Sequence, residues 1–230
     1  MIEISNLSKH FFIGEKRIDV LRELSLNIKK DKITVILGRS GCGKTTLLRL
    51  IAGLESVSLG EIKFKEQAKI GFVFQEPRLM PFLNVYENIV FPLKKNEIEP
   101  EKIGSLISMI GLSDFKLASV SQLSGGMSSR VSLARVLAYE ANLILMDEPF
   151  AALDAFTRAS MQAEILKIQA GKTILFVTHN IDEALFLADE IILLEKGGIK
   201  SNYELSNLAR PRDLLSDELI AIKRKILSEI

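Results

Sequence analysis

The segment GRSGCGKTT at residues 38–46 constrains the fold more than any other part of the chain. It fits the phosphate-loop pattern G-x-x-x-x-G-K-[ST], and it lies between an apolar run at 33–37 and a helix-like run at 47–54. In such a strand, loop and helix, glycines let backbone N–H groups turn toward an anion, and the positive helix end adds to the field. The segment therefore predicts a site for the phosphates of a nucleotide, with a plain glycine-rich turn as the alternative.

Individual residues of this loop have separate predicted roles. Lys44 is expected to reach the β- and γ-phosphates, and the Thr45 hydroxyl is expected to bind Mg²⁺. Cys42 is the single cysteine, which excludes an internal disulfide and suits a reducing compartment. Modification of Cys42 should block nucleotide entry, although the residue could be there simply because it is small. The rest of the loop should surround the phosphates: Gly38, Arg39, Ser40, Gly41, Gly43 and Thr46.

A second signal is the apolar run at 143–146, which two acidic residues follow. Such a run is typical of a fully buried parallel strand whose carboxyl end lies at the mouth of the sheet. We expect Asp147 to hold Mg²⁺ through water and Glu148 to polarise the attacking water, because phosphoryl transfer depends on charge neutralisation and alignment of the nucleophile. Taken alone, the run could also be a strand that ends in a solvated turn.

The segment LSGGM at residues 123–127 separates this chain from other phosphate-loop enzymes. Ser124 and the N–H groups of Gly125 and Gly126 predict an anion site at a helix start, although Ser124 alone could be an ordinary N-cap. Ser124 precedes Asp147 by 23 residues. With these motifs in this order, the chain resembles the ATP-binding subunits of ABC transporters, whose family signature the segment is.

The resemblance implies a fold class and further site residues. The fold is that of an α/β phosphate-loop NTPase, an ABC ATPase with a small antiparallel β-lobe and an inserted helical subdomain. Two subunits pair head to tail, so that the signature of one caps the nucleotide on the phosphate loop of the other. Positions that match the family's motifs add four site residues. Gln75 in FVFQ is implied as a Mg²⁺ ligand and relay to the membrane partner, and Asp154 in ALD as a residue between the paired sites. His179 in FVTH is implied at the γ-phosphate, and Phe11 as the ring that stacks on adenine, with Phe12 as the competing choice.

Partners and cofactors also follow from the resemblance. It implies ATP and Mg²⁺, a second copy as dimer partner, two integral membrane permease subunits, an extracytoplasmic solute-binding protein, and a location at the cytoplasmic face of the cell membrane. The segments at 78–89, 148–158 and 210–213, together with Met127, are similar to the nitrate/sulfonate/taurine branch of importers. The alternatives are an ATPase of an exporter or lipid-extraction system, a soluble mechanical ATPase, and a regulator that does not hydrolyse ATP.

Composition narrows these alternatives. Thirty basic and 29 acidic residues give a net charge of +1 without a basic block, so nucleic acid is not an expected partner. The length of 230 residues suits one ATP-binding unit, not the tandem pair of translation ATPases. No apolar run approaches the roughly 18 to 20 residues that cross a bilayer, so we expect the chain to reach the membrane through a partner.

The pattern along the chain predicts one domain over residues 1–230. Its core and β-lobe should comprise 1–76 and 135–230, and its helical subdomain 77–134. Residues 1–37 alternate as strands of the antiparallel lobe. Strands are also expected at 143–147, 174–178 and 191–194; helix signals are a cap at Asn84 with Glu87, Pro100 in a first turn, and an amphipathic packing helix from Ser216.

An apolar cluster follows Gln75 in a segment that should lie on the surface. Exposed clusters of this kind usually mark interaction sites, and the resemblance implies a groove for a short cytoplasmic helix of the membrane subunit. Packing inside the helical subdomain is the alternative. The cluster consists of Leu79, Met80, Phe82, Leu83, Val85 and Tyr86.

Overall fold

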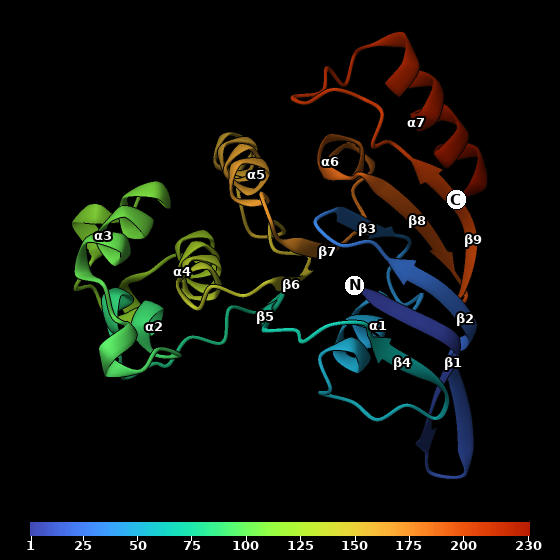
Figure 1. Ribbon diagram of the computed structural model, residues 1–230, viewed down its shortest axis with the longest axis horizontal. Coiled ribbons are helices and arrows are strands. Elements are labelled where there is room, and N and C mark those ends of the chain that lie inside the picture. Colours follow the sequence, from blue (N-terminus) through green and yellow to red (C-terminus); the bar gives the residue numbers. More distant parts are fainter. The chain divides into compact units, whose positions relative to one another are not determined.

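The computed structural model describes residues 1–230, which form two compact units. Unit 1 comprises Met1–Ala68 and Gln169–Ile230, and unit 2 comprises Lys69–Ile168. The chain therefore leaves unit 1 once, builds the whole of unit 2, and then returns to complete unit 1 (Figure 1).

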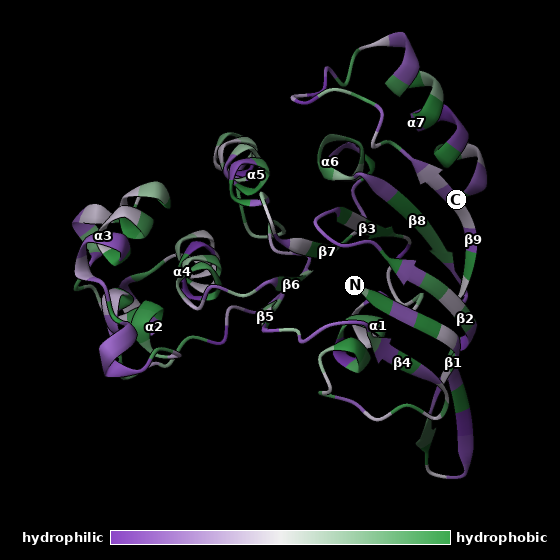
Figure 2. Ribbon diagram, in the orientation of Figure 1, coloured by the Kyte–Doolittle hydropathy of each residue, from purple (hydrophilic) through white to green (hydrophobic).

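A three-stranded antiparallel lobe opens unit 1. Its strands are β1 (Ile2–Ile13), β2 (Lys16–Ile28) and β4 (Leu59–Phe64), in the order β2-β1-β4. The hairpin between β1 and β2 turns at Gly14, whose φ of 60° suits glycine. Hydrophobic and hydrophilic bands alternate along β1 (Figure 2), as expected for a strand with one face on a core.

Four further strands of unit 1 form a mostly parallel sheet. Strands β7 (Thr173–Thr178), β3 (Ile33–Leu37) and β8 (Glu190–Glu195) run parallel, and β9 (Gly198–Glu204) pairs antiparallel with β8. Every residue of β3 and β7 is buried, which explains their continuous apolar sequence. The prediction that residues 1–37 all belong to the antiparallel lobe is wrong for β3, because this strand pairs in parallel with β7 and β8.

Three helices complete unit 1: α1 (Lys44–Ile51), α6 (Ile181–Leu187) and α7 (Asp217–Glu229). Helix α7 begins after Ser216 and packs against α6. Its Leu219 and Ile226 are buried, and hydrophilic and hydrophobic bands alternate along the helix (Figure 2). The predicted packing helix is confirmed.

Two arginines hold the segment before α7 to the end of α6. The buried Arg212 guanidinium donates to the carbonyl oxygens of Leu185 and Ala188 at 2.9 and 2.6 Å, and to that of Leu205 at 2.7 Å. Arg210 lies 3.3 Å from the Asp189 carboxylate. Carbonyl groups at a helix C-terminus lack partners within the helix, and cationic donors satisfy them well. The RPRD segment therefore has a structural role in this chain.

Unit 2 is built on two parallel strands and a set of helices. Strand β5 (Ile70–Val73) pairs with β6 (Leu143–Asp147). The longer helices are α4 (Gly125–Ala138) and α5 (Ala155–Ile168), and the shorter ones are α2 (Val85–Val90), α3 (Pro100–Met109) and the 3-10 turns Lys95–Glu97, Ser113–Phe115 and Val120–Gln122. The bounds of β3 and β6 match the sequence prediction.

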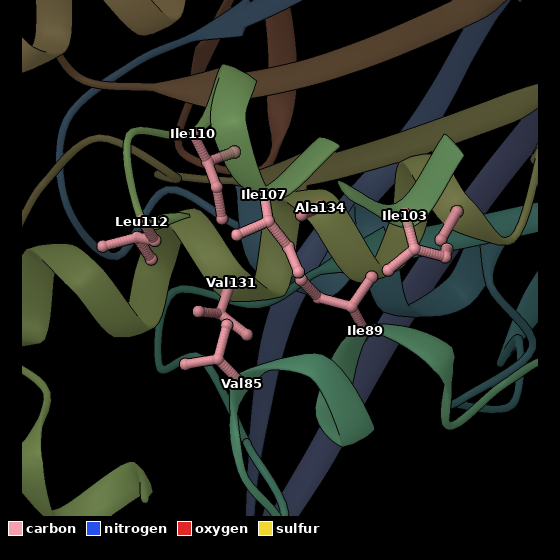
Figure 3. Packing of buried hydrophobic residues seen from close by; sticks show 9 residues of the cluster. Val85, Ile89, Ile103, Ile107, Ile110, Leu112, Val131 and Ala134 are labelled. Carbon is pink, nitrogen blue, oxygen red and sulfur yellow. The ribbon is translucent and has the colours of Figure 1, made fainter. Parts of the chain in front are cut away.

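The helices of unit 2 enclose their own apolar cluster, drawn in Figure 3. Helix α2 starts with a capping box, in which the Asn84 side chain accepts from the Glu87 N–H and the Glu87 carboxylate accepts from the Asn84 N–H. Pro100 occupies the first turn of α3, as predicted. The cluster consists of Val85, Ile89, Ile103, Ile107, Ile110, Leu112, Val131, Ala134 and Ala138.

Candidate functional site

The phosphate loop joins β3 to α1 and packs tightly on β2. Gly43 has a φ of 107°, and a Cβ atom there would lie 2.7 Å from Leu21 Cδ2 and 2.9 Å from the Val20 carbonyl oxygen. Only glycine combines this backbone conformation with so close an approach. The loop is therefore shaped by its contact with β2, and it opens α1 with backbone N–H groups that have no partner within the helix.

Lys44 folds back over its own loop. Its side chain is 4 % exposed, and its Nζ atom donates to the carbonyl oxygens of Gly38 and Arg39 at 2.8 and 3.0 Å. The ammonium is thus held inside the loop, where it adds positive charge to the N-terminal end of α1. This arrangement suits an anion with several oxygens, such as a polyphosphate.

Cys42 lies on the side of the loop that faces β8. A Cβ atom at Gly38 would meet both Cys42 Sγ, at 2.8 Å, and the Leu194 carbonyl oxygen, at 2.4 Å. Burial raises the pKa of the Cys42 thiol, and the nearby Lys44 ammonium opposes this only in part. A pocket of about 330 Å³ borders this side of the loop, with Lys196 and Glu229 among its lining residues. Cys42 is therefore a protonated, buried thiol at neutral pH.

His179 follows a strand that neighbours the phosphate loop. In the parallel pairing of β3 with β7, Leu37 lies opposite Thr178. Gly38 and His179 therefore leave the sheet side by side, at a strand spacing of about 4.8 Å. Asn180 accepts from the N–H groups of Asp182 and Glu183 and so caps α6. The exposed His179 is held between a buried strand and a capped helix.

Unit 2 places the predicted acidic residues and the glutamine at one end of its strand pair. Val73 lies opposite Met146, so Asp147, the last residue of β6, and Gln75, two residues after β5, both lie at the carboxyl ends of parallel strands. Asp147 is 4 % exposed, and Gln75 is exposed. Glu148 has a φ of 45°, a left-handed conformation that is uncommon for a residue with a side chain. Six other non-glycine residues of the chain also have a positive φ, so this conformation does not by itself identify a functional site.

The signature segment and the loop after Glu148 lie together in unit 2. The exposed Ser124 caps α4, its hydroxyl accepting from the Met127 N–H at 3.2 Å. A Cβ atom at Gly126 would lie 3.2 Å from the Ala152 carbonyl oxygen. Asp154 accepts from the N–H groups of Phe156 and Thr157, both at 3.0 Å, and the bonds to Thr157 hold the pKa of Asp154 below its usual value.

Arg135 connects helix α4 to the loop after Gln75. Its guanidinium donates to the carbonyl oxygens of Arg78 and Pro77 at 3.1 and 3.0 Å. Because Ser124 is the N-cap of the same helix, α4 connects the signature to the glutamine loop. Arg135 was not predicted from the sequence, because one arginine in a helix has no pattern that distinguishes it from a solvated residue.

The two candidate aromatics for the base differ in their surroundings. Phe11 is partly buried and lies opposite Ile18 of β2, two residues before Val20, which contacts the phosphate loop. Phe12 is 64 % exposed and packs edge-on against His10, with ring centroids 5.4 Å apart. Both rings have a neighbour on β1, and Phe11 is the less exposed of the two.

The predicted site residues divide between the units as follows. Unit 1 holds the phosphate loop, Phe11 and His179, and unit 2 holds Gln75, Ser124–Gly126, Asp147, Glu148 and Asp154. The donor set predicted for Mg²⁺ contains a hydroxyl from Thr45, an amide oxygen from Gln75 and a carboxylate from Asp147. Hard oxygen ligands with a single carboxylate fit Mg²⁺ that also binds phosphate and water.

A phosphate loop, together with a buried strand that ends in two acids, defines a phosphate-loop nucleotide triphosphatase. A family model described as "ABC transporter" matches residues 21–151. The chain belongs to the ABC transporter family and is an ATPase, the ATP-binding subunit of a transporter. The predicted fold class is confirmed by a solved dimeric ATP-binding cassette bound to ADP and Pi, which is 33 % identical, with a TM-score of 0.83 over 89 % of this chain and 99 % of that one.

Two import ATP-binding proteins align with most of this chain. An aliphatic sulfonates import ATP-binding protein of Bacillus cereus is 38 % identical over 99 % of this chain and 95 % of its own length. A spermidine/putrescine import ATP-binding protein of Bacteroides fragilis is 42 % identical, over 87 % of this chain but 46 % of its own length. The resemblance to the sulfonate branch of importers is thus confirmed. No helix of this protein has both the length and the apolar character needed to span a bilayer.

Proposed function

We propose that this protein drives solute import as a head-to-tail homodimer bound to two membrane permease subunits at the cytoplasmic face of the membrane. ATP would lie between the phosphate loop of one subunit and the Ser124 segment of the other. Support for import comes from the names of the relatives, which are import ATP-binding proteins. The sulfonate relatives match along nearly their full length, which favours a small organic or inorganic oxyanion as solute, delivered by an extracytoplasmic solute-binding protein.

Hydrolysis would use residues of both units. Lys44 and the loop N–H groups would hold the phosphates, and His179, beside the loop, would contact the γ-phosphate. Glu148 would orient and polarise the attacking water. Bound Mg²⁺, held by Thr45, Gln75 and Asp147, would neutralise charge on the phosphate oxygens.

One observation carries the proposed membrane partner: Phe82 is 78 % exposed on a loop that is firmly held. The fully buried Asn88 accepts from the Met80 N–H at 2.8 Å and donates to the carbonyl oxygens of Met80, Leu83 and Asn84 at 3.0 to 3.2 Å. An ordered loop that presents a phenyl ring to solvent is typical of an interaction site.

The rest of the apolar cluster after Gln75 is divided between the surface and the interior. Val85 is fully buried in the helical core, so the prediction of an exposed cluster is wrong for this residue. Leu79 and Tyr86 also pack against that core. A pocket of about 490 Å³ lies in unit 2, lined by aromatic and apolar residues that include Phe72, Phe74, Met80, Phe91 and Pro92. Its size and composition suit a turn of a partner helix.

The test is Phe82→Asp in cells that carry the permease subunits. We expect the variant to fold and hydrolyse ATP but to lose co-purification with an integral membrane protein. Leu227→Asp is the matched control, because Leu227 is a 56 % exposed apolar residue on α7. Membrane association that survives Phe82→Asp would contradict the docking proposal, and an unfolded variant would favour internal packing.

A further inference from the structure

A buried lysine lies against the ring of Phe11. The Nζ atom of Lys9 is 4.5 Å from the ring centroid, although Lys9 is only 6 % exposed. Both residues belong to β1 and point to the same face, because side chains two apart in a strand share a face. A cation at this distance over an aromatic face is attracted by the ring quadrupole.

The ammonium of Lys9 is held in place by the chain that follows the phosphate-loop helix. It donates to the Ser56 carbonyl oxygen at 2.8 Å and lies 3.4 Å from the Glu55 carboxylate. These partners compensate the cost of burying the charge, which would otherwise be high. Lys9 therefore cannot leave the ring without breaking a buried charged hydrogen bond.

The ring has a fixed position along the strand that contacts the phosphate loop. Phe11 lies opposite Ile18, and Val20 contacts Gly43. The register of β1 with β2 is irregular here and skips Val20. Two residues of a strand span at most about 7 Å, comparable to the ribose that separates a base from its phosphates. Phe11 is partly exposed, and Lys9 lies over one face of its ring.

We propose that Lys9 is a positioning residue for the nucleotide base, an inference that rests on the proposed ATP binding and on the stacking of adenine on Phe11 that the family resemblance predicts. The cation restricts the ring to one orientation, which lowers the entropy cost of stacking. It also draws electron density toward itself, so the opposite face favours an electron-rich purine. Base recognition is then shared by a cation, a phenyl ring and the base, stacked in that order.

The experiment compares ADP with pyrophosphate as calorimetric ligands, because pyrophosphate lacks the base. Lys9→Met removes the charge, Lys9→Gln retains a donor for Ser56, and Lys9→Arg keeps a cation. We expect both neutral variants to weaken ADP binding about three- to ten-fold, in the range of partly desolvated cation–π contacts, and to leave pyrophosphate binding unchanged. Lys9→Arg should bind ADP nearly as the parent does, and in ATP hydrolysis the loss should fall on KM rather than kcat.

The outcomes separate this inference from the stacking on which it rests. In a Phe11→Ala background, Lys9→Gln should cause no further loss of ADP affinity. Equal loss of ADP and pyrophosphate binding would show that Lys9 merely supports the phosphate loop, and unchanged ADP binding in a folded neutral variant would overturn the inference. If Phe11→Ala alone leaves ADP affinity intact, the stacking itself fails. Thermal melts identify any variant that does not fold. If Lys9→Met does not fold, the ADP affinity of Lys9→Gln tests the inference.

Discussion

The Nζ atom of Lys44 lies 2.8 Å from the carbonyl oxygen of Gly38, within its own loop. A phosphate that binds here must compete with this bond, and it offers a charged acceptor in exchange for a neutral one. The ammonium already donates as a cation, but only the phosphate adds the attraction between opposite charges, so the exchange favours the phosphate. The Lys44 ammonium therefore already lies inside the loop where the phosphates of a nucleotide would bind.

Mixed subunits test whether the site is shared between two copies. A Lys44→Ala subunit and a Ser124→Arg subunit should each be inactive alone. When mixed, they should regain one working site in the heterodimer, because the intact Lys44 of one faces the intact Ser124 of the other. ATPase activity of the mixture checks this, and mixed dimers that form but stay inactive would argue against head-to-tail sharing.

Replacing Glu148 by Gln should separate binding from hydrolysis. The amide keeps the shape of the side chain but lacks the charge that polarises water, so phosphate release should fall by about 10²-fold or more while ATP binding persists. In the presence of ATP, dimers of this variant should then accumulate, which size-exclusion chromatography would detect. Glu140→Gln is the control, since Glu140 is also a glutamate of unit 2 with positive φ, at 54°. Parental activity in Glu148→Gln would remove Glu148 as the base.

Removing the buried arginine before α7 should destabilise the protein. Burial lowers the pKa of Arg212 to about 10, which still leaves it cationic at neutral pH, so three carbonyl groups receive charged donors. Arg212→Met should cost about 2 to 4 kcal/mol, or about 4 to 16 °C in Tm. Differential scanning calorimetry measures the loss, with the exposed Arg224→Met as control. An unchanged Tm would show that the three bonds add no net stability.

The reactivity of Cys42 should depend steeply on pH. Because burial raises the pKa of this thiol above its ordinary value, the thiolate fraction is small at pH 7 and grows about tenfold per pH unit until that higher pKa is reached. Alkylation by iodoacetamide, followed by mass spectrometry, should therefore still be rising at pH 9, whereas the unfolded chain levels off earlier. A rate that levels off near pH 8 in the folded protein would contradict the buried assignment.

The sequence predicted features with local signals and missed those that depend on distant partners. The buried strand that ends at Asp147 and the capping box at Asn84 depend on neighbouring residues in the sequence, so their bounds could be predicted. Lys9 reads as an ordinary solvated cation, and its role depends on Ser56, 47 residues further along. Arg135 likewise bonds to Pro77, 58 residues before it, and Arg212 to the end of α6. Long cationic side chains reach partners that no local pattern reveals.

Two glycines from different parts of unit 1 pack closely against strand β2. Val20 contacts Gly43 of the phosphate loop, and Gly197, in the turn between β8 and β9, would bring a Cβ atom within 2.4 Å of the same Val20 carbonyl oxygen. The Arg22 N–H also donates to the Gly197 carbonyl oxygen at 2.9 Å. Neither backbone can slide without a clash. The distance between β2 and the phosphate loop is therefore fixed, and if adenine stacks on Phe11 as proposed, unit 1 would accept only a ligand whose base and phosphates lie that far apart.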